Sequence, residues 1–345
     1  MGAILCLREI CICTELKTLQ TLMYLYNLMV TAKQTAVICP TKDRPEKVSR
    51  LLDSLVNQTV KPGIVIVVDT GRGNEHIEQT YKGKLNVKHL ISPVYGQVQQ
   101  RSYAHKQLEK KIQLVMHLDD DITVEPDGIE VFLKDWNKEK VRDGKPLGGM
   151  SFNVVDAVKP TSNIIRSFMF AQAAPGFVNA SGYSSAYAPT DHSFETNWLL
   201  GGSTGWCRSV IDAFPHPINF PTRWAVCEDV IFSYGINRAY RLMVTHGAKV
   251  RHNETYESLS IRKAVFYGKS QVIMRHFFVR MYDDLSMLKF FWMSFSQSVG
   301  YVLMGVLGKK RYFGFGLGGI IGLAACLSTG LRFDEARGLA KKLYG

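Results

Sequence analysis

Short apolar runs alternate with amphipathic segments from residue 35 onward. Residues 35–39, 64–68 and 112–116 are almost entirely apolar, which is typical of strands buried on both faces. Residues 45–56 place valine and leucine on one helical face, and residues 97–111 are also expected to form a helix. This order predicts an α/β fold with a doubly wound, mostly parallel sheet, whose functional residues lie just after the strands.

The periodicity is weaker in the middle of the chain. A third strand is expected at residues 87–91. Residues 146–223 are rich in glycine, serine, asparagine and aromatic side chains, which favours a loop-rich substrate region over a separate domain. A helix is then expected from Glu228 to about residue 240, followed by a short strand at residues 241–245.

The last third of the chain contains two long runs without charge, at residues 290–308 and 312–331. Each run could span a bilayer, but a hairpin would place the basic loop at residues 309–311 on the far side from a cytosolic body, against the positive-inside tendency. We therefore expect helices that lie in the membrane interface, with basic side chains on anionic head groups. Two apolar helices packed on the body as ordinary core are the alternative.

The N-terminal segment has no convincing signal peptide, because charged residues interrupt it and no small-residue cleavage site follows. Residues 16–30 have helical apolar spacing, so they form either an amphipathic docking helix or an artefact of start-site choice. The expected division is an N-terminal extension at residues 1–34, a catalytic domain at 35–255 and a helical, membrane-associating region at 256–345.

Composition narrows the class of protein. With 345 residues, of which 46% are hydrophobic, the chain is globular and not mainly disordered. Its net charge of +12 indicates an anionic partner. Because the sequence has no recognised nucleic-acid-binding motif, a membrane surface or phosphate groups are favoured over nucleic acid. The seven cysteines are odd in number and lack Cys-x-x-Cys spacing, which argues against a structural zinc site and fits reduced thiols in a cytosolic compartment.

Three consecutive acids, Asp119, Asp120 and Asp121, follow the strand expected at residues 112–116. Adjacent anions repel one another, and a divalent cation is the usual compensation. Carboxylate oxygens suit Mg²⁺ or Mn²⁺, and the end of a strand faces the ligand crevice of an open α/β sheet. A solvated acidic turn is the alternative.

Glu228 and Asp229 form a second acidic pair at the start of a predicted helix. A helix N-terminus stabilises an anion, so one carboxylate could act as a general base, although helix capping is the simpler role.

His252 could complete a metal site with the aspartates or be structural. Arg101 follows a glycine turn and could clamp a diphosphate, or it could be a surface charge. The Gly201-Gly202-Ser203 segment could let the backbone approach a substrate closely, or form a plain turn.

Six elements in this order make the chain resemble the inverting family 2 glycosyltransferases, which have a GT-A fold. The resemblance runs from about residue 35 to the C-terminus. Cys39-Pro40-Thr41-Lys42-Asp43-Arg44-Pro45 is similar to the family's first strand and loop, and Val68-Asp69-Thr70-Gly71 to its acidic pair. Leu118-Asp119-Asp120-Asp121 is similar to its Asp-x-Asp metal motif, and Leu200-Gly201-Gly202-Ser203 to its Gly-Gly acceptor loop. Cys227-Glu228-Asp229-Val230 is similar to its Glu-Asp motif, and Val250-Arg251-His252 to its late histidine.

The resemblance implies a role for each matching position. The nucleotide sugar would be bound by Thr41, Arg44, Asp69, Arg101, Asp119 and Asp120. The cation, Mn²⁺ or Mg²⁺, would be held by Asp119, Asp121 and His252. Asp229 would be the general base, supported by Glu228. The acceptor and sugar would lie against Gly201, Gly202, Ser203 and Trp224.

Two positions depart from the family pattern. Asp69-Thr70 replaces the commoner pair of acids, which leaves base recognition uncertain there. Gln100-Arg101-Ser102 stands where the family often has Ala-Arg-Asn, which affects the role of the asparagine and not that of the arginine.

The implied function is the metal-dependent transfer of a sugar from a nucleoside-diphosphate sugar to a hydroxyl of a glycan, with inversion of configuration. The glycan is expected to be lipid-linked, and the reaction would belong to bacterial surface polysaccharide synthesis. UDP is the expected carrier, with dTDP and GDP as alternatives. The enzyme would lie on the cytoplasmic face of the inner membrane as a peripheral protein, and homo-oligomer formation stays open.

A sugar-phosphate nucleotidyltransferase would need a glycine-rich basic loop after the first strand, where this chain offers only Lys42 and Arg44. A non-catalytic membrane-bound scaffold is disfavoured by the intact acids.

Overall fold

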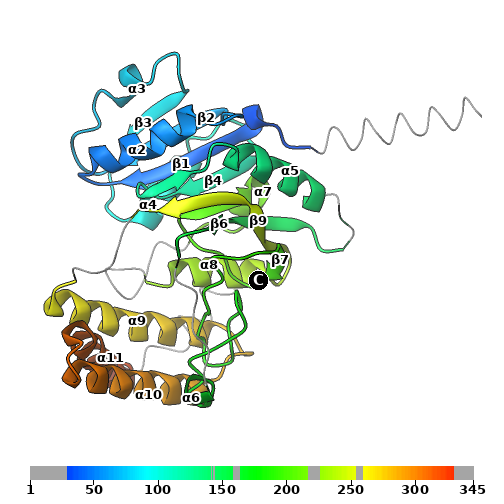
Figure 1. Cartoon of the computed structure of the whole chain (residues 1–345). Coiled ribbons are helices and arrows are strands. Elements are labelled where there is room, and N and C mark those ends of the chain that lie inside the picture. Colours follow the sequence, from blue (N-terminus) through cyan, green and yellow to red (C-terminus); the bar gives the residue numbers. More distant parts are fainter. Residues whose placement is uncertain are drawn as a thin grey trace, which may run out of the picture.

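The computed structural model describes residues 29–140, 142, 144–157, 164–216, 226–253 and 259–329. Trp224, most of the expected N-terminal extension and the end of the C-terminal region lie outside these residues. The chain forms a sheet with helices on both faces, and a layer of helices from the last third of the chain lies below it (Figure 1).

Within the described residues the sheet has nine strands, in the order β3-β2-β1-β4-β8-β6-β9-β5, with β7 paired to β9. The half that contains β3, β2, β1 and β4 is parallel, whereas β8 joins β4 in the antiparallel direction. The expected doubly wound α/β sheet is thus confirmed, but it is mixed, and the mostly parallel order holds only for the half from β3 to β4. The strands are β1 (Thr35–Thr41), β2 (Ile64–Asp69), β3 (Val87–Ile91), β4 (Leu114–Leu118), β5 (Ile122–Val124), β6 (Leu147–Val154), β7 (Phe194–Thr196), β8 (Ser203–Cys207) and β9 (Arg241–His252).

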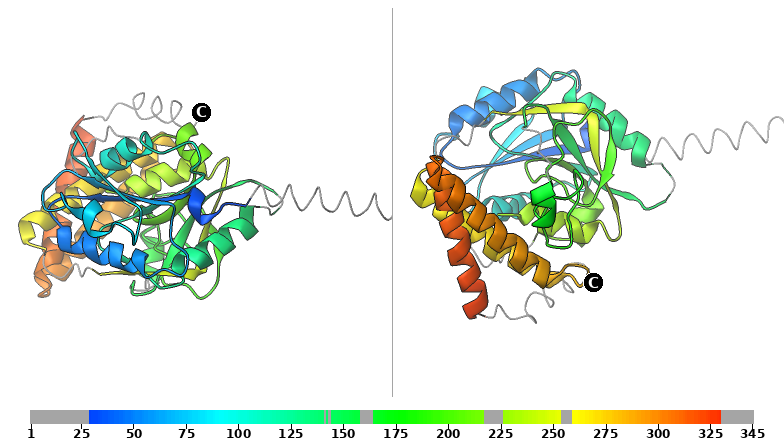
Figure 2. Two further views of the ribbon diagram at one scale, coloured as in Figure 1. Left: turned by 90° about the horizontal axis from the view of Figure 1, so that it is seen from above. Right: turned by 60° about the horizontal axis from the view of Figure 1, so that its bottom comes forward.

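Helices cover the sheet on both faces and form the C-terminal layer (Figure 2). The described helices are α2 (Pro45–Val56), α3 (Ile77–Thr80), α4 (Gln97–His105), α5 (Gly128–Lys140), α6 (Ile164–Phe168), α7 (Arg208–Ala213), α8 (Glu228–Ile236), α9 (Ile261–Met281), α10 (Met287–Val306) and α11 (Lys310–Thr329).

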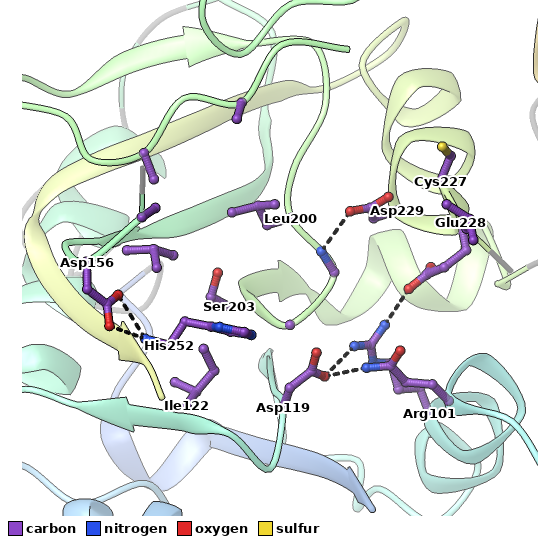
Figure 3. Close-up of a pocket in the computed structure, with 18 of the residues that line it drawn as sticks. Arg101, Asp119, Ile122, Asp156, Leu200, Ser203, Cys227, Glu228, Asp229 and His252 are labelled. Carbon is purple, nitrogen blue, oxygen red and sulfur yellow. Dashed lines mark hydrogen bonds and ion pairs between the residues drawn. The ribbon is translucent and has the colours of Figure 1, made fainter. Parts of the chain in front are cut away.

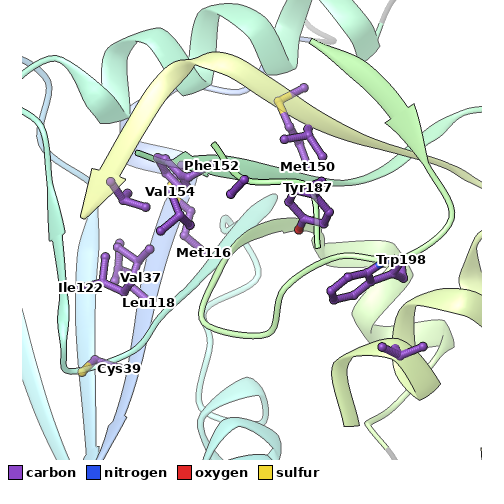
Figure 4. Close-up of a cluster of buried hydrophobic side chains, with 14 of the residues drawn as sticks. Val37, Cys39, Met116, Leu118, Ile122, Met150, Phe152, Val154, Tyr187 and Trp198 are labelled. Carbon is purple, nitrogen blue, oxygen red and sulfur yellow. The ribbon is translucent and has the colours of Figure 1, made fainter. Parts of the chain in front are cut away.

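Alternate side chains of the buried strands supply two separate hydrophobic cores. On one face, Val37 and Met116 of the sheet belong to a cluster that also contains residues of α2 and α5 and continues through Phe152 of β6 (Figure 4). On the other face, Ile38 and Val115 belong to a cluster with residues of α4, α7 and α8. Because both faces are covered, β1 and β4 are apolar at nearly every position, as their sequences predicted.

Three expectations about element boundaries are wrong. Helix α4 ends at His105 and not at residue 111, because the chain must turn back to enter β4 beside the start of β1. Helix α8 ends at Ile236, four residues before the expected end near residue 240, since Arg241 already pairs in β9 opposite Leu147. The short strand expected at residues 241–245 continues to His252 as β9, because its second part pairs with β5. The loop-rich segment at residues 146–223 also supplies β6 and β8 to the middle of the sheet.

The C-terminal helices pack closely because glycines lie at their contacts. Gly314, Gly318 and Gly322 recur every four residues along α11 and face α9, so a Cβ on Gly318 would overlap the carbonyl oxygen of Val265. Gly319 likewise faces Ser298 of α10. Among the described helices, none is both long and apolar enough to cross a membrane.

Candidate active site

A cavity of about 760 Å³ lies where β4 ends and α8 begins (Figure 3). Its walls combine the ends of several strands with the N-terminus of α8, which is the usual ligand position in an open α/β sheet. The side chains that carry its chemistry are Gln97, Arg101, Asp119, Asp156, Glu228, Asp229, His252, Tyr267 and Arg311. Gly201, Gly202 and Ser203 form part of the same wall.

Strand pairing brings the glycine loop against the first aspartate. Leu118 of β4 lies opposite Ser203 of β8, and the pairing continues beyond the strands, where the backbone N–H of Asp119 donates to the carbonyl of Gly202 at 3.0 Å. A Cβ on Gly202 would overlap the carboxylate of Asp119. A Cβ on Gly201 would lie 2.8 Å from Oε1 of Glu228. Both glycines are therefore needed for the acids to approach the loop.

Gly202→Ala is expected to lower catalytic activity by about 100-fold, because the new methyl group would push the Asp119 carboxylate out of position. Steady-state kinetics would measure this decrease. Gly300→Ala is the matched control, since a Cβ there meets nothing within 4 Å. Equal activity of the two variants would show that the position of Asp119 is unimportant.

Arg101 joins the two acidic motifs. Its side chain is only 1% exposed, and its Nη1 donates to Oε1 of Glu228 at 2.8 Å while its Nη2 donates to Oδ1 of Asp119 at 2.8 Å (Figure 3). Gln97, one turn earlier on α4, also donates to Oδ1 of Asp119. A buried guanidinium with two charged partners compensates for its own desolvation and holds both carboxylates in fixed positions.

Glu228 and Asp229 begin α8 from a strained backbone. Cys227, the residue before the helix, has a left-handed conformation with φ of 67°. The carboxylate of Asp229 accepts hydrogen bonds from the backbone N–H of Val230 at 2.9 Å and of Gly201 at 3.4 Å. The second acidic motif thus contacts the glycine loop directly.

Burial dominates the protonation of this acidic pair. It raises the pKa of Glu228 to about 7, although Arg101 partly opposes the shift. Burial also raises the pKa of Asp229, against the lowering effect of its hydrogen bonds from Val230 and Gly201. Carboxyl groups with raised pKa values in a cavity are suited to proton transfer near neutral pH.

The remaining aspartates of the triplet have different partners. Asp120 accepts from Thr41 Oγ1 at 2.7 Å and from Arg44 Nη1 at 3.2 Å, so it ties the end of β1 to the end of β4. Asp121 lies 3.5 Å from Nε2 of His252, because β5 pairs with β9 at that point. Burial and the neighbouring Asp119 raise the pKa of Asp121.

Asp69 lies at the end of β2, beside Thr41 in the sheet. Its carboxylate is fully buried and accepts from the backbone N–H of Gly71 at 2.6 Å and from Nδ2 of Asn74 at 2.7 Å. These bonds shape the turn after β2. The predicted contact between Asp69 and a nucleotide stays a prediction.

Sequence reasoning missed several residues of the cavity wall. Gln97 contacts Asp119, and the carboxylate of Asp156 accepts from the backbone N–H of His252 at 2.9 and 3.0 Å. Asp156 follows β6, so the rule that functional residues follow strands would have found it had β6 been recognised. Tyr267 and Arg311 come from the C-terminal helices, which were expected in the membrane interface or packed on the body as core, and not in the wall of the site. Trp224, predicted near the acceptor, lies outside the described residues.

Comparison with known proteins agrees with the fold and the cavity described above. The family model for glycosyl transferase family 2 matches residues 36–168, a range that contains β1 to β6 and the aspartate triplet. Comparison with curated proteins finds no match.

Solved structures share the fold at low sequence identity. Staphylococcus aureus TarS 1–349 in complex with UDP-GlcNAc is 19% identical, with 90% of this chain and 89% of that chain covered and a TM-score of 0.50. GalNAc-T7 with UDP, GalNAc and Mn²⁺ is 13% identical, with 88% and 58% covered and a TM-score of 0.52. Residues 36–168 thus match the glycosyl transferase family 2 model, and the chain shares the GT-A fold of these solved glycosyltransferases.

Proposed function

We propose that this enzyme is a divalent-cation-dependent, inverting glycosyltransferase that moves a sugar from a nucleoside-diphosphate sugar to a hydroxyl of a lipid-linked glycan in bacterial surface polysaccharide synthesis. One observation carries the proposal. Arg101 holds the acid after β4 and the acid at the start of α8 on one cavity, with the Gly201-Gly202 loop between them. A donor and an acceptor could therefore meet within that cavity.

The nucleotide would lie over the ends of β1 and β2. Thr41, Arg44 and Asp69 would hold its base and ribose, and Asp120 would keep the first two in place through its hydrogen bonds. Arg101 would face the diphosphate from α4. UDP is the proposed carrier, and the fold-level likeness to TarS with bound UDP-GlcNAc and to GalNAc-T7 with bound UDP supports it.

The residues fit a hard divalent cation. Oδ1 of Asp121 is buried and has no hydrogen-bond partner in the described part of the chain, and Asp119 and the imidazole of His252 lie close by. Carboxylate oxygens with one imidazole suit Mn²⁺ or Mg²⁺. When bound, such an ion neutralises charge on the leaving diphosphate. The Mn²⁺ of GalNAc-T7 supports this assignment.

Asp229 would take the proton of the acceptor hydroxyl as its oxygen forms a bond to the anomeric carbon and the bond to the diphosphate breaks. Attack from the face opposite the leaving group inverts the configuration. The backbone N–H groups of Gly201 and Val230 fix the orientation of the Asp229 carboxylate, and Glu228 supports it from the neighbouring position.

A donor screen tests the proposal. The purified enzyme is incubated with UDP-, GDP- and dTDP-sugars and Mn²⁺ or Mg²⁺, and released nucleoside diphosphate is measured with and without EDTA. Cation-dependent release from one donor is expected, and NMR of the product should show inverted anomeric configuration. Full activity in EDTA would contradict the cation role, and retained configuration would contradict the single displacement.

The pKa of Glu228 predicts an acidic limb in the pH profile. Burial raises this pKa to about 7 and also raises the pKa of Asp229, so the acidic pair gains a proton as the pH falls through about 7. An acidic pair that already holds this proton is a poorer acceptor for the proton of the acceptor hydroxyl. We expect kcat/KM to decrease by about tenfold per pH unit below about pH 7. A limb near 4.5, the ordinary value of a glutamate, would contradict the buried acidic pair.

We propose that the C-terminal layer rests on an anionic membrane surface. Its outer face exposes large apolar side chains, among them Leu288 at 81% and Leu307 at 84%, and α6 adds Ile164 beside it. Trp292 of α10 donates from its indole N–H to the carbonyl of Phe168 in α6, which joins the two parts of the face. Lys309 and Lys310 of the adjoining loop and helix would contact lipid phosphates.

Leu288→Asp combined with Leu307→Asp is expected to weaken binding to vesicles of anionic phospholipid by at least about tenfold, because two apolar anchors are lost and two anions are gained. Cosedimentation measures the bound fraction. Ile91→Asp, at an exposed apolar position of β3, is the matched control and should bind like wild type. Unchanged binding of the double variant would remove this face from the membrane contact.

A further inference from the structure

Three histidines form a buried cluster outside the cavity. His105 ends α4, His117 lies within β4 and His216 follows α7, so three separate segments contribute one ring each. Their side chains point into the core between the sheet and the helices α4, α7 and α8, and no more than 8% of any of these residues is exposed. One ring nitrogen from each lies within 4.8 Å of those of the other two.

The ring arrangement matches coordination of one ion. The ring centroids of His105, His117 and His216 are 5.0, 5.6 and 5.4 Å apart. With zinc–nitrogen bonds of about 2.1 Å and tetrahedral angles, two coordinating imidazole rings would have their centroids about 5 Å apart. The Nε2 atoms of His105 and His117 are 2.8 Å apart, the distance of a hydrogen bond between the two rings, and a tetrahedral zinc ion bound by both would separate them to about 3.4 Å.

Several nitrogens of the cluster lack other partners. Nδ1 of His117 and both ring nitrogens of His216 are buried without a hydrogen bond to any described residue. Leaving such groups unsatisfied in the core is costly, and a ligand for them would remove that cost. His216 is further held by stacking on Phe232, with ring centroids 3.6 Å apart.

The protonation and charge of the surroundings are compatible with a cation. Burial lowers the pKa of His105 to about 3, so this ring is neutral at physiological pH, as a metal ligand must be. Two positive groups, Arg101 and Arg208, lie near His105. The charge of Arg101 is compensated by Asp119 and Glu228, and that of Arg208 by Asp212.

We propose that His105, His117 and His216 bind a Zn²⁺ ion that is distinct from the cation of the active site. Three imidazoles suit zinc and related transition metals, whereas Mn²⁺ and Mg²⁺ prefer oxygen ligands. The cysteine spacing, which argues against zinc, does not reveal this site because its ligands come from three segments far apart in the sequence. The ion would hold α4 against β4 and so fix the helix that carries Arg101.

Metal analysis tests this site. The full-length wild-type protein is loaded with ZnSO₄, passed through gel filtration and analysed by mass spectrometry for bound zinc, and a second sample is loaded with Co²⁺ for visible absorption. About one retained zinc per chain and the absorption of a tetrahedral cobalt centre are expected. Zinc should also raise the melting temperature, and 1,10-phenanthroline should reverse the rise.

Matched variants separate this site from others. His216→Asn and, independently, His105→Gln should lose the retained zinc, whereas His192→Asn at an exposed position should keep it. Asp121→Asn, which alters the active-site cation ligands, should also keep it. Wild-type protein that retains no zinc and shows no change in melting temperature would overturn the proposal, as would full zinc retention by His216→Asn. The histidines would then form a neutral, hydrogen-bonded cluster.

Discussion

Replacement of Asp229 with asparagine should lower kcat for sugar transfer by about 10²- to 10⁴-fold, the usual contribution of a general base. The amide keeps the size of the side chain, and its oxygen can still accept the hydrogen bond from the backbone N–H of Gly201 or Val230. The variant should therefore fold and bind the donor normally. What it loses is the ability to take the proton of the acceptor hydroxyl.

Two measurements make this test specific. Isothermal titration with the nucleoside diphosphate should give the same affinity for Asp229→Asn and wild type, while single-turnover transfer to the acceptor should be slow. Glu109→Gln is the matched control, because it makes the same carboxyl-to-amide change at a side chain that is 62% exposed. Transfer by Asp229→Asn at the wild-type rate would show that another group is the base.

Arg101→Met should destabilise the enzyme by about 3–5 kcal/mol, because it removes one partner from a buried charged network and leaves two carboxylates without it. The linear methionine side chain preserves much of the volume, so the lost charge dominates. Urea unfolding would measure the change in the free energy of unfolding. Arg142→Met, at an arginine that is 59% exposed, should change it by less than about 1 kcal/mol.

The same variant should shift the pH profile. Arg101 lowers the pKa of Glu228 against the effect of burial, so its removal should raise that pKa further above the ordinary value. Residual activity should then have its acidic limb at higher pH than in wild type. A loss of stability comparable to that of Arg142→Met, or an acidic limb displaced to lower pH, would mean that Arg101 does not hold the two acids together.

The parallel half of the fold could be predicted from the sequence because its strands are buried on both faces. Runs such as residues 64–68 contain no polar residue to obscure the pattern. The antiparallel half could not be predicted. β6 and β8 are buried at almost every position but contain glycines and serines, which give no hydrophobic period. Gly149 and Gly205 leave room for the rings of Trp206 and Phe132.

The candidate active site could likewise be predicted only in part from the sequence. The acids at residues 119–121 were recognisable because three charges directly follow an apolar run, and those at residues 228–229 because they fit the order of the family's motifs. Their connection was not, since it depends on the register that places Ser203 opposite Leu118 and on an arginine whose partners lie 18 and 127 residues away. Asp156 and Gln97 were missed for this reason: their importance comes from what they contact and not from local sequence.

The shared guanidinium makes the two ends of the cavity thermodynamically linked. Any ligand that draws Asp119 away from Arg101 leaves more of the positive charge to Glu228 and so lowers its proton affinity. Linkage is reciprocal, so protonation of Glu228 must weaken that ligand by the same factor. Binding of the donor would therefore favour the deprotonated acidic pair that the acceptor requires. The enzyme would then bind the donor before the acceptor, without any moving lid.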